Sequence, residues 1–368
     1  MSAALAAIIR DEIGREGLIS FRRFMELALY HSEHGYYTSG RARVGRGGDF
    51  FTNVSVGPLF GKLLARQFAE MWRRLGQPAN FAIVEQGAHE GHFALDALGA
   101  LKEADPDCFV ATTYRIVEPS SALLASQRER LAGWPVEWTS DLSQLSAITG
   151  VHVSNELIDA FPVHVVKWTG RDWVERCVAN KGAEFEFVDR PISSPQLAVA
   201  CGRIPQPLPP EYTTEVNLSA ETWIAEVAGR MERGFILAID YGFLRDDYYM
   251  PERNEGTLSA YAHHKRERDP LREPGEFDLT AHVDFSSLME AGAAAGLRVA
   301  GFTDQHHLMV GLGAGYFADG APVNPSELRA FQTLMHPTLM GMAFKAVAFQ
   351  KSVSDENALM AFRYARVN

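Results

Sequence analysis

Acidic residues close several apolar runs of strand type, and two glycines follow the first of these acids. Glu85 closes a run that begins at residue 81, and Gly87 and Gly91 follow it. Glycines let the backbone approach a bound nucleoside closely, and the helix that comes next offers free N–H groups. Glu118 closes the next apolar run, where its two oxygens can accept hydrogen bonds from both hydroxyls of a ribose. A plain turn and a solvated strand-end acid are the ordinary alternatives for these two motifs.

The sign of the charge in the glycine turn selects among nucleoside cofactors. The carboxylate of Glu85 would repel a phosphate group and attract the cationic methionine end of S-adenosylmethionine. We therefore predict S-adenosylmethionine as the cofactor, in contact with Glu85, Gly87, Gly91 and Glu118.

A second polar group follows the fourth expected strand. Asn155, Glu156 and Asp159 lie there, and Asp240 ends the fifth expected strand in the same way. Because open α/β sheets bind ligands at the carboxyl ends of their strands, we expect these acids at one rim. Glu156 and Asp159 are predicted as catalytic carboxylates, since a carboxylate can pair bidentately with an arginine acceptor. Asn155 and Glu156 are also predicted to contact the cofactor; helix-capping acids are the alternative.

Two further segments supply candidates for closing the site. Asp49 and Thr52 lie in a glycine-rich loop and are predicted to close the pocket over the cofactor, with an Asx-type turn as the alternative. Residues 244–278 are dense in charge and tyrosine, which is typical of a lid. His264 in this segment is predicted to act on a substrate proton, although a lone histidine is often structural. The pair His306 and His307 has no further residue at ligand spacing, so no metal site is predicted.

Alternating strands and helices must position these residues. From residue 81 onward they indicate βαβ units and a parallel sheet. Three β-like runs within 163–188 suggest an antiparallel meander, and the proline-rich residues 191–210 suggest a linker or surface loop. We divide the chain into residues 1–80, a helical segment with a cofactor-closing loop, and residues 81–368, a Rossmann-like core with insertions near 163–232 and 244–280. Helices are expected at 59–75, 93–101, 122–131, 220–233, 285–295 and 325–335.

Composition restricts the class of partner. The 368 residues carry a formal net charge of -11, which opposes binding to nucleic acid, and no window reaches the apolar length of a membrane span. Three widely spaced cysteines favour reduced thiols over a disulfide framework. We expect a cytoplasmic protein with a protein substrate, no nucleic acid or membrane partner, and a homodimer as a further possibility.

Characteristic segments occur in one order along nearly the whole chain. They are HSEHGYYTSG (31–40), GDFFTN (48–53), LFGKLLA (59–65), VEQGAHEGHFALDAL (84–98), IVEPSSALLASQ (116–127), NELIDAFPVH (155–164), IDYGF (239–243), GTLSAYAHHK (256–265) and EFDLTAHVDFS (276–286). With them the chain resembles the MidA family of class I methyltransferases, which includes mitochondrial members linked to assembly of respiratory complex I. The resemblance implies a Rossmann-like fold with a seven-stranded, mostly parallel sheet, an N-terminal helical segment and an inserted antiparallel and lid region. It also implies methylation of a protein arginine in at least some members.

Two departures from the family pattern leave alternatives open. The family usually has Gly-Pro-Gly-Arg-Gly after the first strand, whereas this chain has His89 for the central glycine and Glu90 for the arginine. After Thr52 the family usually has Ser-Pro-Glu or Ala-Pro-Glu, whereas this chain has Asn53, Val54 and Ser55. A pseudoenzyme with weakened cofactor binding is therefore one alternative. An NAD-dependent oxidoreductase is the other, and the acid in the glycine turn disfavours it.

Overall fold

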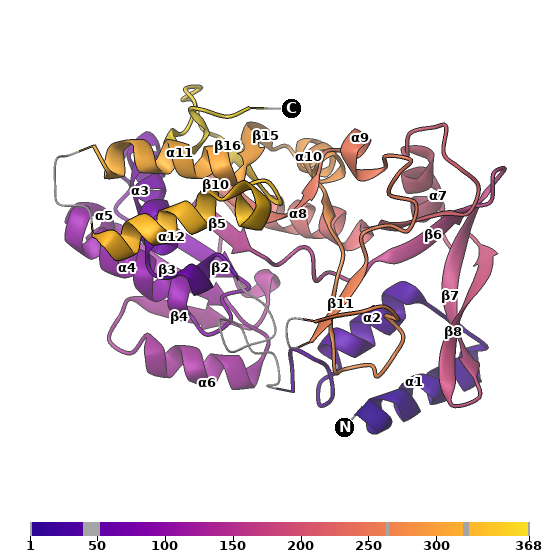
Figure 1. The fold of residues 1–368 in the computed structure, drawn as a ribbon. Helices are drawn as coiled ribbons and strands as arrows, with labels where there is room; N and C mark the ends of the chain where they lie inside the picture. Colours follow the sequence, from indigo (N-terminus) through magenta and orange to yellow (C-terminus); the bar gives the residue numbers. More distant parts are fainter. Residues whose placement is uncertain (1, 40–51, 263–264, 319–323, 367–368) are drawn as a thin grey trace. The chain divides into compact units, whose positions relative to one another are not determined.

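The computed structural model describes residues 2–39, 52–262, 265–318 and 324–366 (Figure 1). The chain forms two compact units, each built from three stretches of sequence. The sheet unit comprises residues 51–157, 223–241 and 289–368, and the accessory unit comprises residues 1–50, 158–222 and 242–288. Residues 51–80 thus belong with the sheet, so this grouping differs from the division at residue 80 that the sequence suggests.

A mixed, mostly parallel sheet forms the centre of the sheet unit (Figure 1). Its strands lie in the order β15-β16-β10-β5-β2-β3-β4, and β14 (Val283–Asp284) pairs with the last residues of β10. Of these strands, β16 runs antiparallel to both its neighbours, and the pairings among the five strands from β10 to β4 are parallel. The bounds are β2 (Phe81–Gln86), β3 (Thr112–Val117), β4 (Val136–Thr139), β5 (Ile148–Asn155), β10 (Met231–Phe243), β15 (Arg298–Asp304) and β16 (Phe344–Lys351).

The strand order fixes where a ligand can bind. The chain passes from β2 to β3 and β4 on one side, and then returns to add β5 on the other side of β2. Ligands of open α/β sheets bind outside the carboxyl ends of the strands at this kind of reversal. The residues that follow β2, β3 and β5 are those the sequence predicts as the site.

Helices cover both faces of the sheet. On one face, α3 (Leu59–Arg74), α4 (His92–Ala104) and α11 (Gln305–Tyr316) bury their apolar stripes against alternate strand residues such as Ile83 and Val153. On the other face, Trp223 of α8 (Leu218–Arg230) donates from Nε1 to Gln86 Oε1 at 2.8 Å, and Gly292 of α10 (Phe285–Ala294) lies against Phe349. The remaining helices of the unit are α5 (Pro106–Ala111), α6 (Ser121–Arg130) and α12 (Pro325–Met335), with helical turns at Val54–Val56, Leu142–Gln144, Pro337–Gly341 and Met360–Phe362.

The accessory unit contains two antiparallel sheets. A five-stranded sheet has β1, β7, β6 and β9 in that order, with β8 paired to β7, and a three-stranded sheet has the order β12-β11-β13. The bounds are α1 (Ser2–Glu16), β1 (Ile19–Ser20), α2 (Phe21–Tyr30), β6 (His164–Trp168), β7 (Trp173–Lys181), β8 (Glu184–Pro191), α7 (Pro195–Gly202), β9 (Tyr212–Val216), α9 (Arg245–Tyr248), β11 (Ser259–Ala262), β12 (Lys265–Glu267) and β13 (Asp278–Thr280). The predicted meander is confirmed as β6, β7 and β8, which form an antiparallel sheet together with β1 and β9.

Two segments differ from the sequence-based expectation. Residues 191–210 contain α7, because Ser194 caps the helix at Leu197 N and Pro195 occupies the first helical position, where its missing N–H costs nothing. Helix α11 was not predicted, since its glycines disguise the periodicity. Asp304 caps it by accepting from His307 N at 2.9 Å, so the Asp304 and histidine group has a structural explanation.

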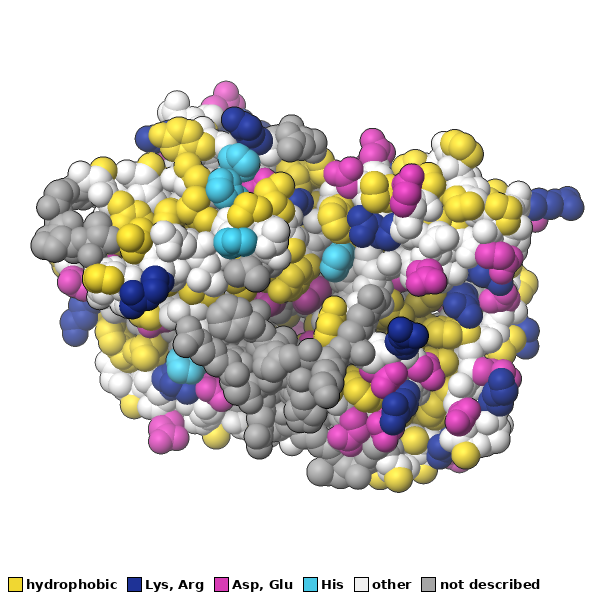
Figure 2. Space-filling view, in the orientation of Figure 1, with side chains coloured by type: hydrophobic (Ala, Val, Ile, Leu, Met, Phe, Trp, Pro, Cys, Tyr) yellow, Lys and Arg dark blue, Asp and Glu magenta, His cyan; other side chains and the backbone are white. Residues whose placement is uncertain are grey.

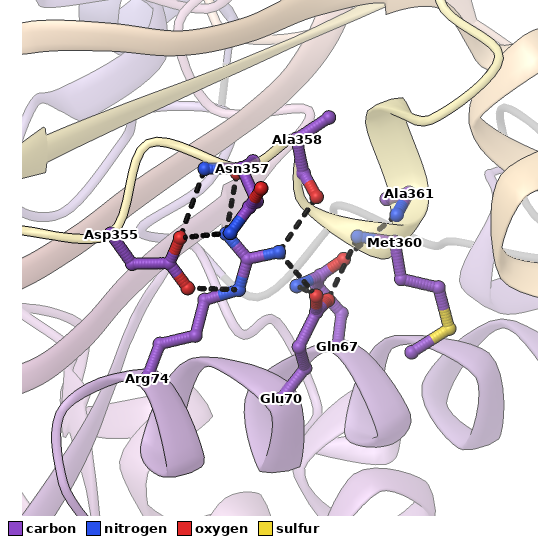
Figure 3. A network of polar contacts seen from close by, with 8 residues as sticks. All are labelled: Gln67, Glu70, Arg74, Asp355, Asn357, Ala358, Met360 and Ala361. Carbon is purple, nitrogen blue, oxygen red and sulfur yellow. Dashed lines mark hydrogen bonds and ion pairs between the residues drawn. The ribbon is translucent and has the colours of Figure 1, made fainter.

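The segment after β16 packs along α3 and fixes the position of that helix (Figure 3). Arg74 donates to the carbonyl oxygens of Asn357 and Ala358 and to the carboxylate of Glu70. Glu70 also accepts from Met360 N at 2.8 Å. Because the side chain of Arg74 is only 11% exposed, its loss would leave several acceptors without a donor.

We predict that Arg74→Ala lowers the free energy of unfolding by about 2 kcal/mol, because the carboxylate of Glu70 loses a charged donor and the mostly buried side chain of Arg74 no longer joins α3 to the segment after β16. Arg73→Ala is the matched control on the same helix, since Arg73 makes an exposed pair with Asp105; its cost should stay below about 1 kcal/mol. Urea denaturation measures both. Equal costs for the two variants would contradict the anchoring role of Arg74.

A histidine lies in the middle of the central strand β5 without a polar partner. His152 is fully buried, and neither ring nitrogen has a hydrogen-bond partner among the described residues. Its ring lies 5.7 Å from the ring of Trp223. Burial lowers the pKa of His152 from its usual 6.5 to about 3, so the folded protein holds it neutral.

The lowered pKa of His152 predicts a loss of stability in acid. Below pH 6.5 the unfolded chain takes up a proton that the folded chain refuses until about pH 3, so stability falls as the pH falls between these values. The slope from this residue is about 1.4 kcal/mol per pH unit. We expect His152→Leu to remove that slope in denaturation measured from pH 7.5 to pH 4.5. Parallel curves for the variant and the wild type would show that His152 does not contribute.

Candidate functional site

The turn between β2 and α4 depends on its two glycines. Gly87 has φ of 83° and Gly91 has φ of 80°, in the left-handed region that glycine enters without strain. Gly91 is also the N-cap residue directly before α4, and no side chain among the described residues caps this helix end. A Cβ at Gly91 would lie 3.1 Å from Leu131 Cδ1. The turn therefore presents backbone N–H groups at the carboxyl end of β2, as a nucleoside site requires.

Glu118 follows β3 directly and is held in a fixed orientation. Its Oε1 accepts from Ser120 N at 2.8 Å, and its Oε2 accepts from Gln127 Nε2 at 2.9 Å. The residue is 7% exposed, and burial raises the pKa of its carboxyl group. Each oxygen keeps a further lone pair, so the carboxylate can accept two more hydrogen bonds, one for each hydroxyl of a ribose.

Gln127 connects the glycine turn to Glu118, and the sequence did not predict its role. This fully buried residue of α6 donates from Nε2 to the His89 carbonyl oxygen at 2.6 Å as well as to Glu118, and its Oε1 accepts from Trp138 Nε1 at 3.1 Å. A glutamine on a helix is usually solvated, so the role of Gln127 becomes visible only from its complete burial in the structure. The amide fixes the distance between the turn after β2 and the acid after β3.

The two departures in the glycine turn have structural counterparts. His89 has φ of 46°. This is the left-handed backbone conformation, which the glycine usual in the family would adopt without strain but which costs energy for a residue with a side chain. Glu90 turns towards α6, where its Oε2 lies 3.0 Å from Arg130 Nη2, and its carbonyl oxygen accepts from Arg130 Nε at 2.8 Å. The acid at position 90 thus helps to fasten the turn to α6.

Glu85 and Asp240 lie inside their strands, which corrects the expectation that they end them. Glu85 is buried in β2 and accepts from the Tyr114 hydroxyl at 2.7 Å; burial raises the pKa of its carboxyl group to about 7. A carboxyl group with this pKa is only partly charged at neutral pH, so the attraction of Glu85 for a sulfonium is weaker than the sequence suggests. Asp240 accepts from Leu157 N at 3.1 Å and from Tyr241 N at 2.8 Å. It therefore anchors the loop after β5.

That loop carries Glu156 in a strained conformation. Glu156 has φ of 55°, and its N–H donates to the Ile239 carbonyl oxygen at 3.0 Å. Its Oε1 accepts from Asn155 Nδ2 at 2.9 Å and from Asn53 N at 3.1 Å. Strained backbone of this kind is retained where the surrounding contacts enforce it, as at functional sites.

The N-terminal candidates are partly described. Thr52 is 7% exposed, and its hydroxyl lies 2.8 Å from the hydroxyl of Ser55, whose N–H donates to Thr52 Oγ1 at 3.2 Å. Ser55 thus closes a turn with Thr52 at the position where the family usually has an acid. Asp49 and His264 lie outside the described residues.

Asp159 belongs to the accessory unit, whereas Glu156 belongs to the sheet unit. Its carbonyl oxygen accepts from Ala281 N at 2.9 Å. In the same unit, Tyr37 donates from its hydroxyl to Asp278 Oδ1 at 2.7 Å, and Tyr30 stacks on Tyr37 with ring centroids 5.7 Å apart. Burial, with Asp278 as the nearest charge, raises the pKa of Tyr37, so its hydroxyl stays protonated.

These observations fit the predicted cofactor. The turn with Gly87 and Gly91 and the doubly oriented carboxylate of Glu118 match a nucleoside with a free ribose. Because Glu118 lies where a ribose phosphate would be repelled, the site suits an unphosphorylated sugar.

We predict that Glu118→Ala raises the Kd for S-adenosylmethionine by at least about 100-fold, because two hydrogen bonds to a charged acceptor are lost and each contributes roughly 1.5 kcal/mol or more. Isothermal titration calorimetry measures the affinity. Glu137→Ala is the control, and it should leave the Kd unchanged. It removes an exposed acid of β4 that pairs with Arg115. A change below about 3-fold for a folded Glu118→Ala protein would refute the ribose contact.

Comparisons with known proteins agree with this geometry. Residues 63–303 match the family described as "Putative S-adenosyl-L-methionine-dependent methyltransferase". A crystal structure from Burkholderia thailandensis with bound S-adenosyl-homocysteine is 34% identical to this chain, covers 99% of this chain and 96% of its own, and superposes with a TM-score of 0.89.

Two curated relatives are more distant in sequence. The Drosophila melanogaster protein named protein arginine methyltransferase NDUFAF7 homolog, mitochondrial, is 28% identical over 94% of this chain and 84% of its own length. The Homo sapiens protein named protein arginine methyltransferase NDUFAF7, mitochondrial, is 27% identical over 92% of this chain and 81% of its own length. The family match and the ligand bound to the Burkholderia protein both agree with the geometry of the sheet edge. This chain therefore belongs to the family of S-adenosylmethionine-dependent class I methyltransferases that also contains these relatives.

Proposed function

We propose that this methyltransferase acts on an arginine side chain of a protein. The relatives at 27% and 28% identity are named protein arginine methyltransferases. The observation that carries the proposal is the oriented carboxylate of Glu156 beside the carboxyl ends of β2 and β5. A carboxylate in a fixed orientation can accept a charge-assisted hydrogen bond from one edge of a planar guanidinium and so align its plane, and it binds an ammonium group less specifically.

S-adenosylmethionine, when bound, supplies an electrophilic methyl group on a sulfonium, and the residues of the chain position the acceptor for an in-line displacement. Glu118 and the glycine turn hold the nucleoside. Glu156 orients the guanidinium so that one nitrogen faces the methyl group. The roles that the sequence predicts for the other candidates stay predictions. They are a carboxylate contact with the acceptor for Asp159, contacts with the cofactor for Asn155 and Thr52, closing of the pocket for Asp49 and action on a substrate proton for His264.

The partner is a protein, and we further propose that the enzyme acts in the cytoplasm without a nucleic-acid partner, as a monomer or a homodimer. All three cysteines are buried and free, which suits a reducing compartment. On the face drawn in Figure 2, acidic and basic side chains are interspersed, and the net charge is -11. Within the described residues, no helix combines the length and the apolar character needed to cross a membrane.

The two alternatives from the sequence are less well supported. A pseudoenzyme is not favoured, because the relative at 34% identity was crystallised with S-adenosyl-homocysteine and the turn with His89 and Glu90 keeps its fold in this chain. An NAD-dependent oxidoreductase disagrees with the family.

We predict that Glu156→Gln lowers methyl transfer to arginine-containing peptides about 100-fold, because the acceptor loses its charged partner and its alignment. Mass spectrometry of peptides incubated with S-adenosylmethionine measures the transfer. The Kd for S-adenosyl-homocysteine is measured in parallel. A value within about 2-fold of the wild type assigns Glu156 to the acceptor alone, and a larger rise assigns it to the cofactor as well, as the sequence also predicts. Glu129→Gln on the exposed surface of α6 is the control. Methylation of lysine but not arginine by the wild type would overturn the proposal.

A further inference from the structure

Asn53 lies at the centre of a closed ring of hydrogen bonds beside Glu156. Its N–H donates to Glu156 Oε1 at 3.1 Å, and its Nδ2 donates to Asn155 Oδ1 at 2.9 Å. Asn155 Nδ2 donates to the same oxygen of Glu156 at 2.9 Å, which completes the ring. The ring ties the loop before α3 to the end of β5.

One polar atom of Asn53 is not used by this ring. The residue is fully buried, and its Oδ1 has no hydrogen-bond partner among the described residues. An unsatisfied buried acceptor costs roughly 1–3 kcal/mol, and native proteins retain few such atoms. The ring uses Nδ2 as a donor, which fixes the orientation of the amide group. Oδ1 is therefore held in place as an acceptor without a donor among the described residues.

The chemistry around Oδ1 defines the missing donor. Its neighbour in the ring, Glu156, is an acid, so a cation rich in N–H groups is the kind of ligand that can donate to Oδ1 and be attracted by the carboxyl group beside it. A guanidinium has five N–H donors in a planar fork and no acceptor. An ammonium group has three donors around a single point. A planar fork can reach a carboxylate with one edge and a neighbouring carbonyl with another.

We propose that Asn53 Oδ1 accepts a hydrogen bond from the guanidinium of the methyl acceptor, and that Asn53 acts with Glu156 to select arginine. The inference rests on the proposed function. The other source of the same chemistry is the ammonium group of the cofactor's methionine part, and separate binding measurements for acceptor and cofactor distinguish the two.

The test uses Nα-acetyl-arginine methylamide as the probe and the citrulline analogue, which has the same shape without the charge, as the control ligand. Binding of each is measured by NMR titration of the full chain saturated with S-adenosyl-homocysteine. The wild type should prefer the arginine probe. Asn53→Ala should raise the Kd of that probe about 10-fold, with the Kd for S-adenosyl-homocysteine unchanged.

A second variant separates the Oδ1 contact from the ring. Asn53→Asp keeps an acceptor oxygen but loses the Nδ2 donor, so it should bind the arginine probe within about 3-fold of the wild type. If Asn53→Asp binds as weakly as Asn53→Ala, Asn53 acts only through the ring and the inference is wrong. It is also wrong if Asn53→Ala has no effect, or if that variant weakens S-adenosyl-homocysteine instead of the probe. A wild type that does not prefer arginine over citrulline would reject the proposed function, and the inference with it.

Discussion

The hydrogen bonds of one buried amide organise the cofactor side of this protein. Gln127 joins the turn after β2, through the His89 carbonyl, to the carboxylate of Glu118 after β3. Because the amide is fully buried and uses both of its polar ends, it can hold Glu118 in one orientation only. The parallel sheet brings the ends of β2 and β3 together. The hydrogen bonds of Gln127 then fix the position of Glu118 relative to the turn after β2. We expect the affinity for the ribose to depend on this arrangement, since a carboxylate that is already oriented loses little freedom when it binds.

The acceptor side is built differently, from strain and from a ring of hydrogen bonds. Asp240 fastens the loop after β5 by its hydrogen bond from Leu157, and Glu156 adopts a left-handed conformation directly before that residue. Asn53 brings the loop before α3 onto the same carboxylate. Helix α3 is in turn held at its other end by the segment that binds Arg74 (Figure 3). Positions far apart in the sequence thus determine where one carboxylate lies.

Much of this could be predicted from the sequence, and the omissions have physical causes. Apolar runs that end in acids and glycines are visible without any structure, so the sheet, its ligand edge and Glu118 were predicted. The strand ends were placed too early at Glu85 and Asp240, because hydrophobicity stops at a buried acid although the backbone continues to pair. The sequence gives no signal for the hydrogen bonds of Gln127 and Asn53, since a neutral amide shows its importance only when its burial and its partners are known. The pair Glu156 and Asp159, and the candidates Asp49 and His264, remain predictions.

The most direct test of the account is a crystal structure of this protein in complex with S-adenosylmethionine. The account predicts that the two ribose hydroxyls donate to Glu118, with the hydrogen bonds from Ser120 and Gln127 kept as they are here. A nucleoside bound elsewhere, with Glu118 in contact with Ser120 and Gln127 alone, would contradict it.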